Sequence, residues 1–232
     1  MYYFPYYFWW LAIPGLLLGI YAQIKLSATY SKYSEVENRS GLTGAEAARE
    51  ILDHAALSDM PVEEIDGHLT DHFDPVKKTL FLSSENYQGR SLAAVGVAAH
   101  ESGHALQQQA AYALFDFRMW LVPATQFATS ASYVLFLLGW ILGGALFSKI
   151  IGIAIGLFAI ITVFQVITLP VEIDASRRAK QQLLKLGLVQ PDEGPAISKV
   201  LNAAAMTYVA AMVTAILQLL RLILISNRNS RD

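Results

Sequence analysis

The chain of 232 residues is 54% hydrophobic and only 16% charged, and its formal net charge is −2. An average soluble domain is about 45–50% apolar and about 25% charged, so this composition predicts a membrane protein. The chain has no cysteine, which excludes disulfides, thiolate metal sites and cysteine nucleophiles. It has no basic run or motif that would suit a nucleic acid.

The first apolar stretch, residues 1–24, carries no charged side chain and is rich in Tyr, Phe and Trp. About 20 consecutive apolar residues suffice to cross a bilayer, and aromatic rings favour the level of the lipid headgroups. We therefore expect an N-terminal transmembrane helix over about residues 4–24. An anchor that lies in the membrane interface without crossing is the alternative.

Two helix starts are visible in the polar region that follows. Thr43 and Glu46 match a capping box, which predicts a helix from this point to about Leu57. Ser91 is expected to cap a second, Ala-rich helix over residues 92–110. Both helices would belong to the same polar domain.

Residues 62–83 alternate between polar and apolar side chains around Asp74 and Pro75. This pattern predicts two short strands joined by a turn at that dipeptide. The second strand would include residues 79–83, and it could bind an extended peptide by strand addition. An ordinary sheet strand is the alternative for the same segment.

The Ala-rich helix contains the sequence H-E-S-G-H at residues 100–104, which is the pattern H-E-x-x-H. His100 and His104 are four residues apart, so both imidazoles project from one helical face and can reach one zinc ion. Glu101 borders that face and can act as the general base toward a metal-bound water. This spacing predicts metal-assisted peptide hydrolysis.

Two glycines of the same helix, Gly96 and Gly103, lie near the histidine face. Glycine in a helix interior costs about 1 kcal/mol relative to alanine, so a compensating reason is expected. We expect them to leave room for the ion and a peptide. The alternative for the whole motif is a helix face with His and Glu but no metal.

Long uncharged stretches follow the motif, and they predict a transmembrane hairpin over residues 119–171 with its turn near residues 147–149. A further apolar segment, residues 200–220, either spans or packs on the polar domain. The hairpin returns the chain to the side that it left, so both polar pieces would share one face of the membrane. Lys and Arg gather in these pieces, which predicts a cytoplasmic location for them. The expected segments are a transmembrane helix (1–24), the first part of the catalytic domain (25–118), the hairpin (119–171), the second part (172–199) and a C-terminal helix and tail (200–232).

A catalytic zinc site needs a third protein ligand. Glu172 and Asp174 emerge where the hairpin returns to the membrane surface, and an acidic group near the apolar phase is costly unless it is paired or binds a metal. We expect Glu172 to be the third ligand and Asp174 to accept a hydrogen bond from a ligand histidine. The two roles could be exchanged, and salt bridges to Arg177 or Arg178 are the alternative for both residues.

Two further residues are candidates for contact with the substrate. His72 could assist at the oxyanion, and Tyr208 could donate a hydrogen bond to it. A polar loop histidine and a packed tyrosine are the simpler interpretations. His54 and His68 are expected to be surface or loop residues.

The chain resembles the YugP-type neutral zinc metallopeptidases of bacteria over essentially its whole length. The residues that carry this resemblance are the motif at 100–104, the segment 170–178 and the segment 71–75. More distantly, the chain is similar to HtpX and the CAAX prenyl proteases, which place a membrane hairpin between H-E-x-x-H and a downstream glutamate. The family's glutamate maps onto Glu172. The HtpX-like pattern has an acidic residue four positions later, where this chain has Ser176.

The resemblance implies a mainly α fold, in which membrane helices accompany a zincin-like metalloprotease domain that has a small β-sheet and is split by a transmembrane hairpin. We expect a zinc endopeptidase with one catalytic Zn²⁺, located in a bacterial cell membrane as a multi-pass protein. Its partners would be the lipid bilayer and protein or peptide substrates, and membrane adaptor proteins or further copies of the chain could join them. A zinc-binding membrane scaffold or adaptor without proteolytic activity is the alternative.

Overall fold

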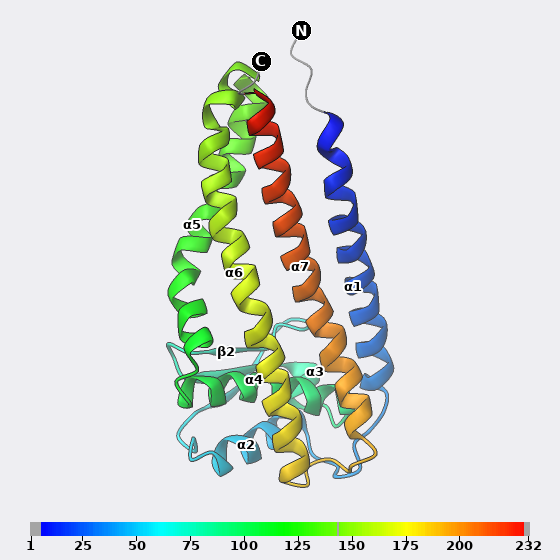
Figure 1. The fold of residues 1–232 in the computed structure, drawn as a ribbon. Helices are drawn as coiled ribbons and strands as arrows, with labels where there is room; N and C mark the ends of the chain where they lie inside the picture. The colour runs from blue at the N-terminus through cyan, green and yellow to red at the C-terminus, as the bar shows by residue number, and fades with distance from the viewer. Residues whose placement is uncertain (1–5, 143, 230–232) are drawn as a thin grey trace. The chain divides into compact units, whose positions relative to one another are not determined.

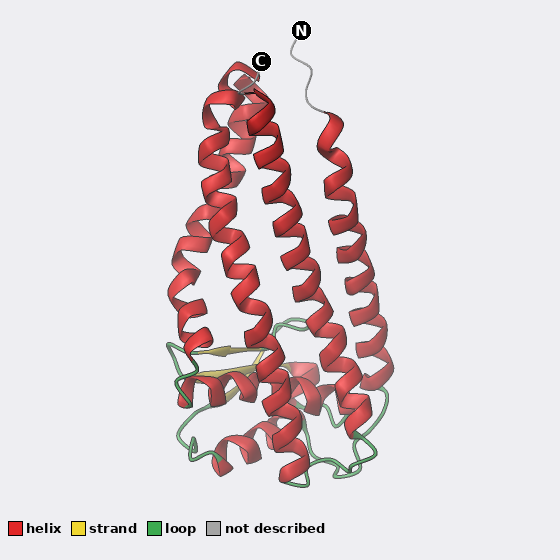
Figure 2. Cartoon of the chain, in the orientation of Figure 1, coloured by secondary structure: helices red, strands yellow, loops and turns green. Residues whose placement is uncertain are grey.

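The computed structural model describes residues 6–142 and 144–229 (Figure 1). The chain is mainly helical, with one small sheet (Figure 2). The elements in chain order are η1 (a 3-10 helix, Tyr6–Leu11), α1 (Ala12–Ser34), α2 (Gly44–His54), β1 (Val62–Ile65), β2 (His72–Asp74), β3 (Thr79–Ser83), α3 (Ser84–Tyr87), α4 (Leu92–Gln109), α5 (Ala113–Leu142), α6 (Gly144–Lys185) and α7 (Gly194–Asn229).

The chain divides into two compact units. The apolar unit comprises Met1–Ala22, Phe117–Leu169 and Thr207–Asp232, and the polar unit comprises Gln23–Asp116 and Pro170–Met206. The unit boundaries fall within the long helices, so α1, α5, α6 and α7 each contribute to both units.

The apolar unit presents large hydrophobic side chains on its surface. Trp120 and Phe136 of α5 are 72% and 73% exposed. Contiguous apolar surfaces of this kind do not suit water and mark contact with lipid or with another protein. Three of the described helices are long and apolar enough to cross a membrane, namely segments Ala113–Leu138, Ile150–Lys185 and Gly194–Arg228. The described part of the fold therefore has three candidate membrane helices, in agreement with the composition.

The first predicted membrane helix differs in its bounds from the observed elements. α1 begins at Ala12 and continues past residue 24 to Ser34, through a more polar half that carries Lys25 and Lys32. Among the helices that the structure describes, α1 is not one of the three candidate spans. Residues 1–5 lie outside the described part of the chain, so a span over residues 4–24 stays a prediction.

The hairpin connection lies earlier than predicted. α5 ends at Leu142 and α6 begins at Gly144, so residues 147–149 are helical. Neither Phe147 nor Ser148 is a residue that breaks a helix, so α6 continues through this segment. Residue 143 itself lies outside the described residues.

The polar unit is built around α4. Its N-cap Ser91 accepts a hydrogen bond from the N–H of Ala94, and the capping box of Thr43 and Glu46 forms at the start of α2, as predicted. α2, the C-terminal part of α6 and the N-terminal part of α7 enclose one hydrophobic core with α4. The core includes Ala47, Ile51, Val95, Ala99, Leu106, Leu183, Ile197 and Leu201.

The sheet has three strands in the order β1-β3-β2 rather than the two predicted. β3 lies in the centre, parallel to β1 and antiparallel to β2. β2 and β3 are the predicted pair on the two sides of the turn at Asp74 and Pro75, and the additional strand is β1, whose residues 62–65 pair with residues 80–83. Since β3 is paired on both sides, the expectation that it accepts a peptide by strand addition is wrong.

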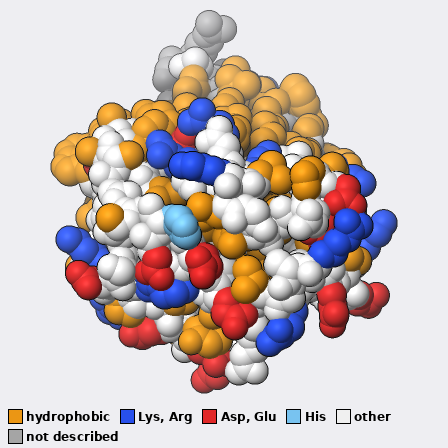
Figure 3. Space-filling view, turned by 90° about the horizontal axis from the view of Figure 1, so that it is seen from below, with side chains coloured by type: hydrophobic (Ala, Val, Ile, Leu, Met, Phe, Trp, Pro, Cys, Tyr) orange, Lys and Arg blue, Asp and Glu red, His pale blue; other side chains and the backbone are white. Residues whose placement is uncertain are grey.

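The surface shown in Figure 3 carries acidic and basic side chains next to one another. Such mixed charge is typical of a water-exposed protein surface.

Candidate metal centre

The two histidines of the motif lie on one face of α4, one turn apart. Their ring centroids are 4.9 Å apart and the rings are nearly perpendicular, at 79°. His104 is buried and His100 is partly buried. Both side chains direct Nε2 to the same acidic side chain of another helix.

That acidic side chain is Glu172 of α6. Its Oε2 atom lies 3.1 Å from His100 Nε2 and 3.5 Å from His104 Nε2. Glu172 is only 1% exposed. One ligand atom from each of the three residues lies within 4.8 Å of the others. The structure thus brings together the two motif histidines and the predicted third ligand, all within the polar unit.

The close approach of α4 and α6 depends on Gly103. A Cβ atom at this position would lie 2.5 Å from the carbonyl oxygen of Ala175, closer than atoms normally approach. Gly96 is tight against α7, where an added Cβ would meet Ile197 Cγ2 at 3.3 Å. The glycines therefore serve the packing of helices, and the expectation that they leave room for ion and peptide is wrong at Gly103.

The donor set suits zinc. Two imidazole nitrogens and one carboxylate oxygen are the ligands of many catalytic zinc sites. Bonds of about 2.0–2.1 Å in a tetrahedral arrangement separate ligand atoms by about 3.3 Å. The observed separations of Glu172 Oε2 from the two Nε2 atoms, 3.1 and 3.5 Å, lie on either side of this value.

The predicted general base, Glu101, lies on α4 beside this cluster. Its Oε2 accepts a hydrogen bond from the backbone N–H of Phe73 in β2, at 3.1 Å. Burial raises the pKa of the Glu101 carboxyl to about 7, because the charged form loses its hydration. The edge of the sheet and the motif helix are thereby joined at this carboxylate.

Each ligand histidine has a polar partner at its second ring nitrogen. His104 Nδ1 lies 2.9 Å from Gln107 Oε1, and His100 Nδ1 lies 3.1 Å from Ser176 Oγ. Asp174, expected to contact a histidine, instead accepts hydrogen bonds from Gln107, Arg177 and Arg178. Its link to His104 therefore passes through the Gln107 amide.

Sequence reasoning missed Gln107 as a histidine partner and noted Ser176 only as a departure from the expected acidic residue. A signal was available for both. Gln107 follows His104 by three residues, and Ser176 follows Glu172 by four, so helical spacing places each on the same face as a ligand. The backbone N–H of Phe73 left no such signal, because every residue type except proline supplies a backbone N–H.

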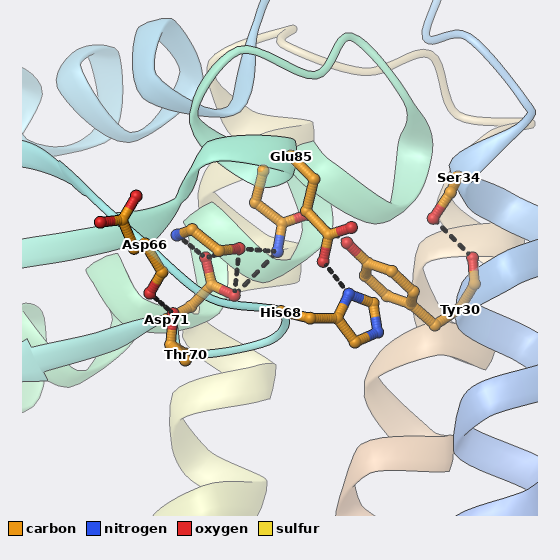
Figure 4. A network of polar contacts seen from close by, with 9 residues as sticks. Tyr30, Ser34, Asp66, His68, Thr70, Asp71 and Glu85 are labelled. Atoms are coloured by element: carbon orange, nitrogen blue, oxygen red, sulfur yellow. Dashed lines mark hydrogen bonds and ion pairs between the residues drawn. The ribbon is translucent and has the colours of Figure 1, made fainter.

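A polar network holds the loop that leads into β2 (Figure 4). The Asp71 carboxylate accepts hydrogen bonds from the backbone N–H and the hydroxyl of Ser83 and from Asn86 Nδ2. Tyr30 of α1 donates to Asn86 Oδ1 at 2.8 Å. The network fixes the chain two residues before Phe73, and so helps to place the amide that contacts Glu101.

The remaining predicted residues do not belong to the cluster of three ligand atoms. His72 is exposed, stacks on Phe81 with centroids 5.0 Å apart, and directs Nδ1 to the carbonyl of Thr70. Tyr208 is half-buried in α7 and belongs to the apolar unit. His54 is exposed near the end of α2, and the exposed His68 pairs with Glu85.

Comparison with known proteins also points to zinc. Residues 8–227 match the family described as "Putative neutral zinc metallopeptidase". The chain belongs to this family. It is also 46% identical over 225 residues to the "Putative membrane protease YugP" of Bacillus subtilis (strain 168), with 97% of this chain and 98% of that protein covered. No solved structure matches the chain.

The family match covers the motif helix, the hairpin and Glu172 together. Membership in a neutral zinc metallopeptidase family implies zinc as the metal, and the cluster of two histidines and one glutamate provides a place for it.

Proposed function

We propose that the protein is a zinc-dependent endopeptidase in which His100, His104 and Glu172 hold one catalytic zinc ion. The observation that carries this proposal is the convergence of three ligand atoms from two helices that are distant in the chain. Within the sequence 72 residues separate His100 from Glu172. A buried carboxylate set between two imidazoles is costly unless a cation compensates it, and zinc supplies that charge.

Glu101 is the proposed general base. When bound, zinc lowers the pKa of its water and polarises the scissile carbonyl. The Glu101 carboxylate accepts the proton of the attacking water and later delivers it to the leaving amine. In the metal-free protein, burial raises the pKa of this carboxyl to about 7, and a group that takes up and releases a proton works best near the operating pH. The Phe73 N–H orients the carboxylate through its hydrogen bond.

The proposed substrates are membrane or membrane-proximal proteins. Glu172 follows directly on the apolar run of α6, residues 150–171, so the ligand is tied along the chain to a candidate membrane span. Peptide bonds of proteins held at the same membrane would be enriched near such a site. His72 and Tyr208 stay candidates for contact with the substrate.

We further propose a multi-pass location in the bacterial cell membrane with the polar unit in the cytoplasm. Lys and Arg lie mainly in the segments that form this unit, as the positive-inside rule requires for a cytoplasmic location.

The decisive experiment compares metal content and proteolysis of the purified full chain in detergent. Glu101→Gln should keep about one zinc per chain and lose cleavage of an unfolded protein substrate by at least about 10²-fold. His100→Ala and Glu172→Ala should lose both zinc and cleavage. His54→Ala, at an exposed histidine on α2, is the control and should change neither.

Three outcomes would contradict the proposal. Unchanged zinc in Glu172→Ala would remove it as a ligand and direct the search to Asp174, His68 or His72. Full cleavage by Glu101→Gln would refute the assignment of the base. A wild-type protein that binds zinc but cleaves no unfolded substrate would favour the scaffold function instead.

A further inference from the structure

Gln107 is fully buried in the Ala-rich helix α4, with an exposed fraction of 0%. Burial of a primary amide is unfavourable unless its hydrogen bonds are made, so the contacts of this side chain must compensate the loss of its hydration. Its three contacts are His104 Nδ1 at 2.9 Å, the Val171 carbonyl at 2.8 Å and Asp174 Oδ2 at 3.0 Å. It therefore connects a ligand histidine on α4 to the segment of α6 that carries Glu172.

The orientation of this amide is dictated by its surroundings. The Val171 carbonyl can only accept a hydrogen bond, and the Asp174 carboxylate, paired with Arg177 and Arg178, also accepts. Both N–H groups of Gln107 must therefore point at these oxygens. The reverse orientation would place the Gln107 oxygen against two acceptors and leave the amide N–H groups unsatisfied.

A fixed amide fixes the histidine. With its nitrogen committed to α6, Gln107 presents only Oε1 to His104 Nδ1, and an oxygen of this kind accepts a proton. In a neutral imidazole one nitrogen carries the proton and the other carries the lone pair. His104 therefore holds a proton on Nδ1, and the neutral imidazole then has its lone pair on Nε2, the atom that a metal would bind. Without a metal, a second proton on Nε2 would give the imidazolium, which can donate to Glu172 Oε2 at 3.5 Å, so the geometry fixes Nδ1–H and not the state of Nε2.

The other histidine is not constrained in this way. His100 Nδ1 faces the hydroxyl of Ser176, which can either donate or accept. The tautomer of His100 is therefore left to other contacts. Among the contacts of the described residues, the arrangement singles out His104 as the ligand whose protonated nitrogen is determined before any metal arrives.

We propose that Gln107 is a positioning residue that keeps a proton on Nδ1 of His104. Its amide is held in the required orientation by hydrogen bonds to Val171 and Asp174 of α6. The inference rests on the proposed zinc site, because its consequence is a metal ligand prepared in the form that binds. A histidine fixed by a neighbouring acceptor typically raises metal affinity, and loss of such a partner costs about 10–100-fold. Because the Gln107 amide contacts both His104 and α6, the orientation of His104 depends on the position of α6, the helix that supplies the third ligand.

Two variants separate this role from simple packing. Gln107→Met keeps a long unbranched side chain but offers no acceptor to His104. Gln107→Glu keeps an oxygen for the His104 N–H. Both lose the two N–H donors to Val171 and Asp174, and Gln107→Glu also sets an oxygen against these two acceptors, so a purely structural role predicts at least as large a loss in Gln107→Glu as in Gln107→Met. Gln109→Met, at an exposed position two residues on, is the matched control.

The experiment uses the full chain, labelled with ¹⁵N-histidine, in detergent. In the metal-free wild type, the nitrogen shifts of His104 should report a proton on Nδ1, and with five histidines in the chain, single replacements can assign the signals. Gln107→Met should lose this preference, and Gln107→Glu should keep it. Zinc affinity, measured by competition with a chelating dye, should fall about 10–100-fold in Gln107→Met and less than about threefold in Gln107→Glu and Gln109→Met.

The inference is overturned if metal-free wild type carries no proton on His104 Nδ1, or if Gln107→Glu weakens zinc binding as much as Gln107→Met. The wild-type spectrum needs no variant to fold. These outcomes are distinct from failure of the proposed function, in which wild type and all variants alike bind no zinc while the tautomer of His104 can still be read.

Discussion

Gly103 of α4 lies directly against the backbone of Ala175 in α6, so close that a Cβ atom would come within 2.5 Å of the Ala175 carbonyl oxygen. This contact lies between His100 and His104 on one helix and beside Glu172 on the other. The lack of a side chain at Gly103 thus permits α4 and α6 to approach closely enough for His100, His104 and Glu172 to meet.

Replacing Gly103 with alanine should force the two helices apart. A methyl group against backbone cannot be relieved by a rotamer change, and such overpacking typically costs about 1–3 kcal/mol. We expect a lower unfolding midpoint and zinc affinity weakened by at least about tenfold, measured by thermal unfolding and chelator competition. Gly96→Ala meets only the Ile197 side chain at 3.3 Å, and it should retain zinc affinity. Equal effects of the two substitutions would contradict this account.

Removal of the metal should destabilise the polar unit, because a ligand that binds only the folded state stabilises it by mass action. At free zinc 100 times the dissociation constant, this contribution is about 2.7 kcal/mol. Chelation should therefore lower the Tm of the wild type but leave that of His100→Ala nearly unchanged. A chelator that shifted both by the same amount would act elsewhere on the protein.

Asp71 should matter for catalysis without binding the metal. Asp71→Ala removes the acceptor for the N–H and hydroxyl of Ser83 and for Asn86, and unsatisfied buried donors cost about 1–3 kcal/mol. We expect kcat to fall while zinc content stays at the wild-type level. The reason is that β2, whose Phe73 N–H donates to the Glu101 carboxylate, shifts, whereas the three metal ligands do not. Asp66→Ala, exposed in the same loop, is the control. Loss of zinc in Asp71→Ala would show that the network supports the ligands themselves.

The raised pKa of Glu101 predicts a pH dependence of stability in the metal-free protein. The folded state holds the proton up to about pH 7, whereas the unfolded chain releases it near the ordinary pKa of 4.5. The contribution of this group to stability is therefore full below pH 4.5 and is lost as the pH rises to about 7. Glu101→Gln lacks this loss, so its Tm relative to wild type should increase over that interval. A difference in Tm that stays constant from pH 4.5 to 7.5 would refute the shift.

The sequence alone determined the parts of the protein that depend on nearby residues. The spacing of H-E-x-x-H predicts two histidines on one helical face, and the long apolar runs predict helices that could cross a membrane. Thr43 and Ser91 mark helix starts through hydrogen bonds to residues close by in the chain. A few neighbouring residues suffice to encode each of these features. The choice of Glu172 also came from the sequence, through its place after the hairpin and the family resemblance.

Tertiary structure decided what lies between segments far apart in the chain. It placed β3 in the centre of the sheet and Gln107 between His104 and Asp174. It also showed that Gly103 is needed because α4 lies against the backbone of Ala175 at this position. These relationships join residues separated by as many as 72 positions, as between Gly103 and Ala175. No local rule encodes them, because they depend on how closely two helices approach and which side chain fills the space between them.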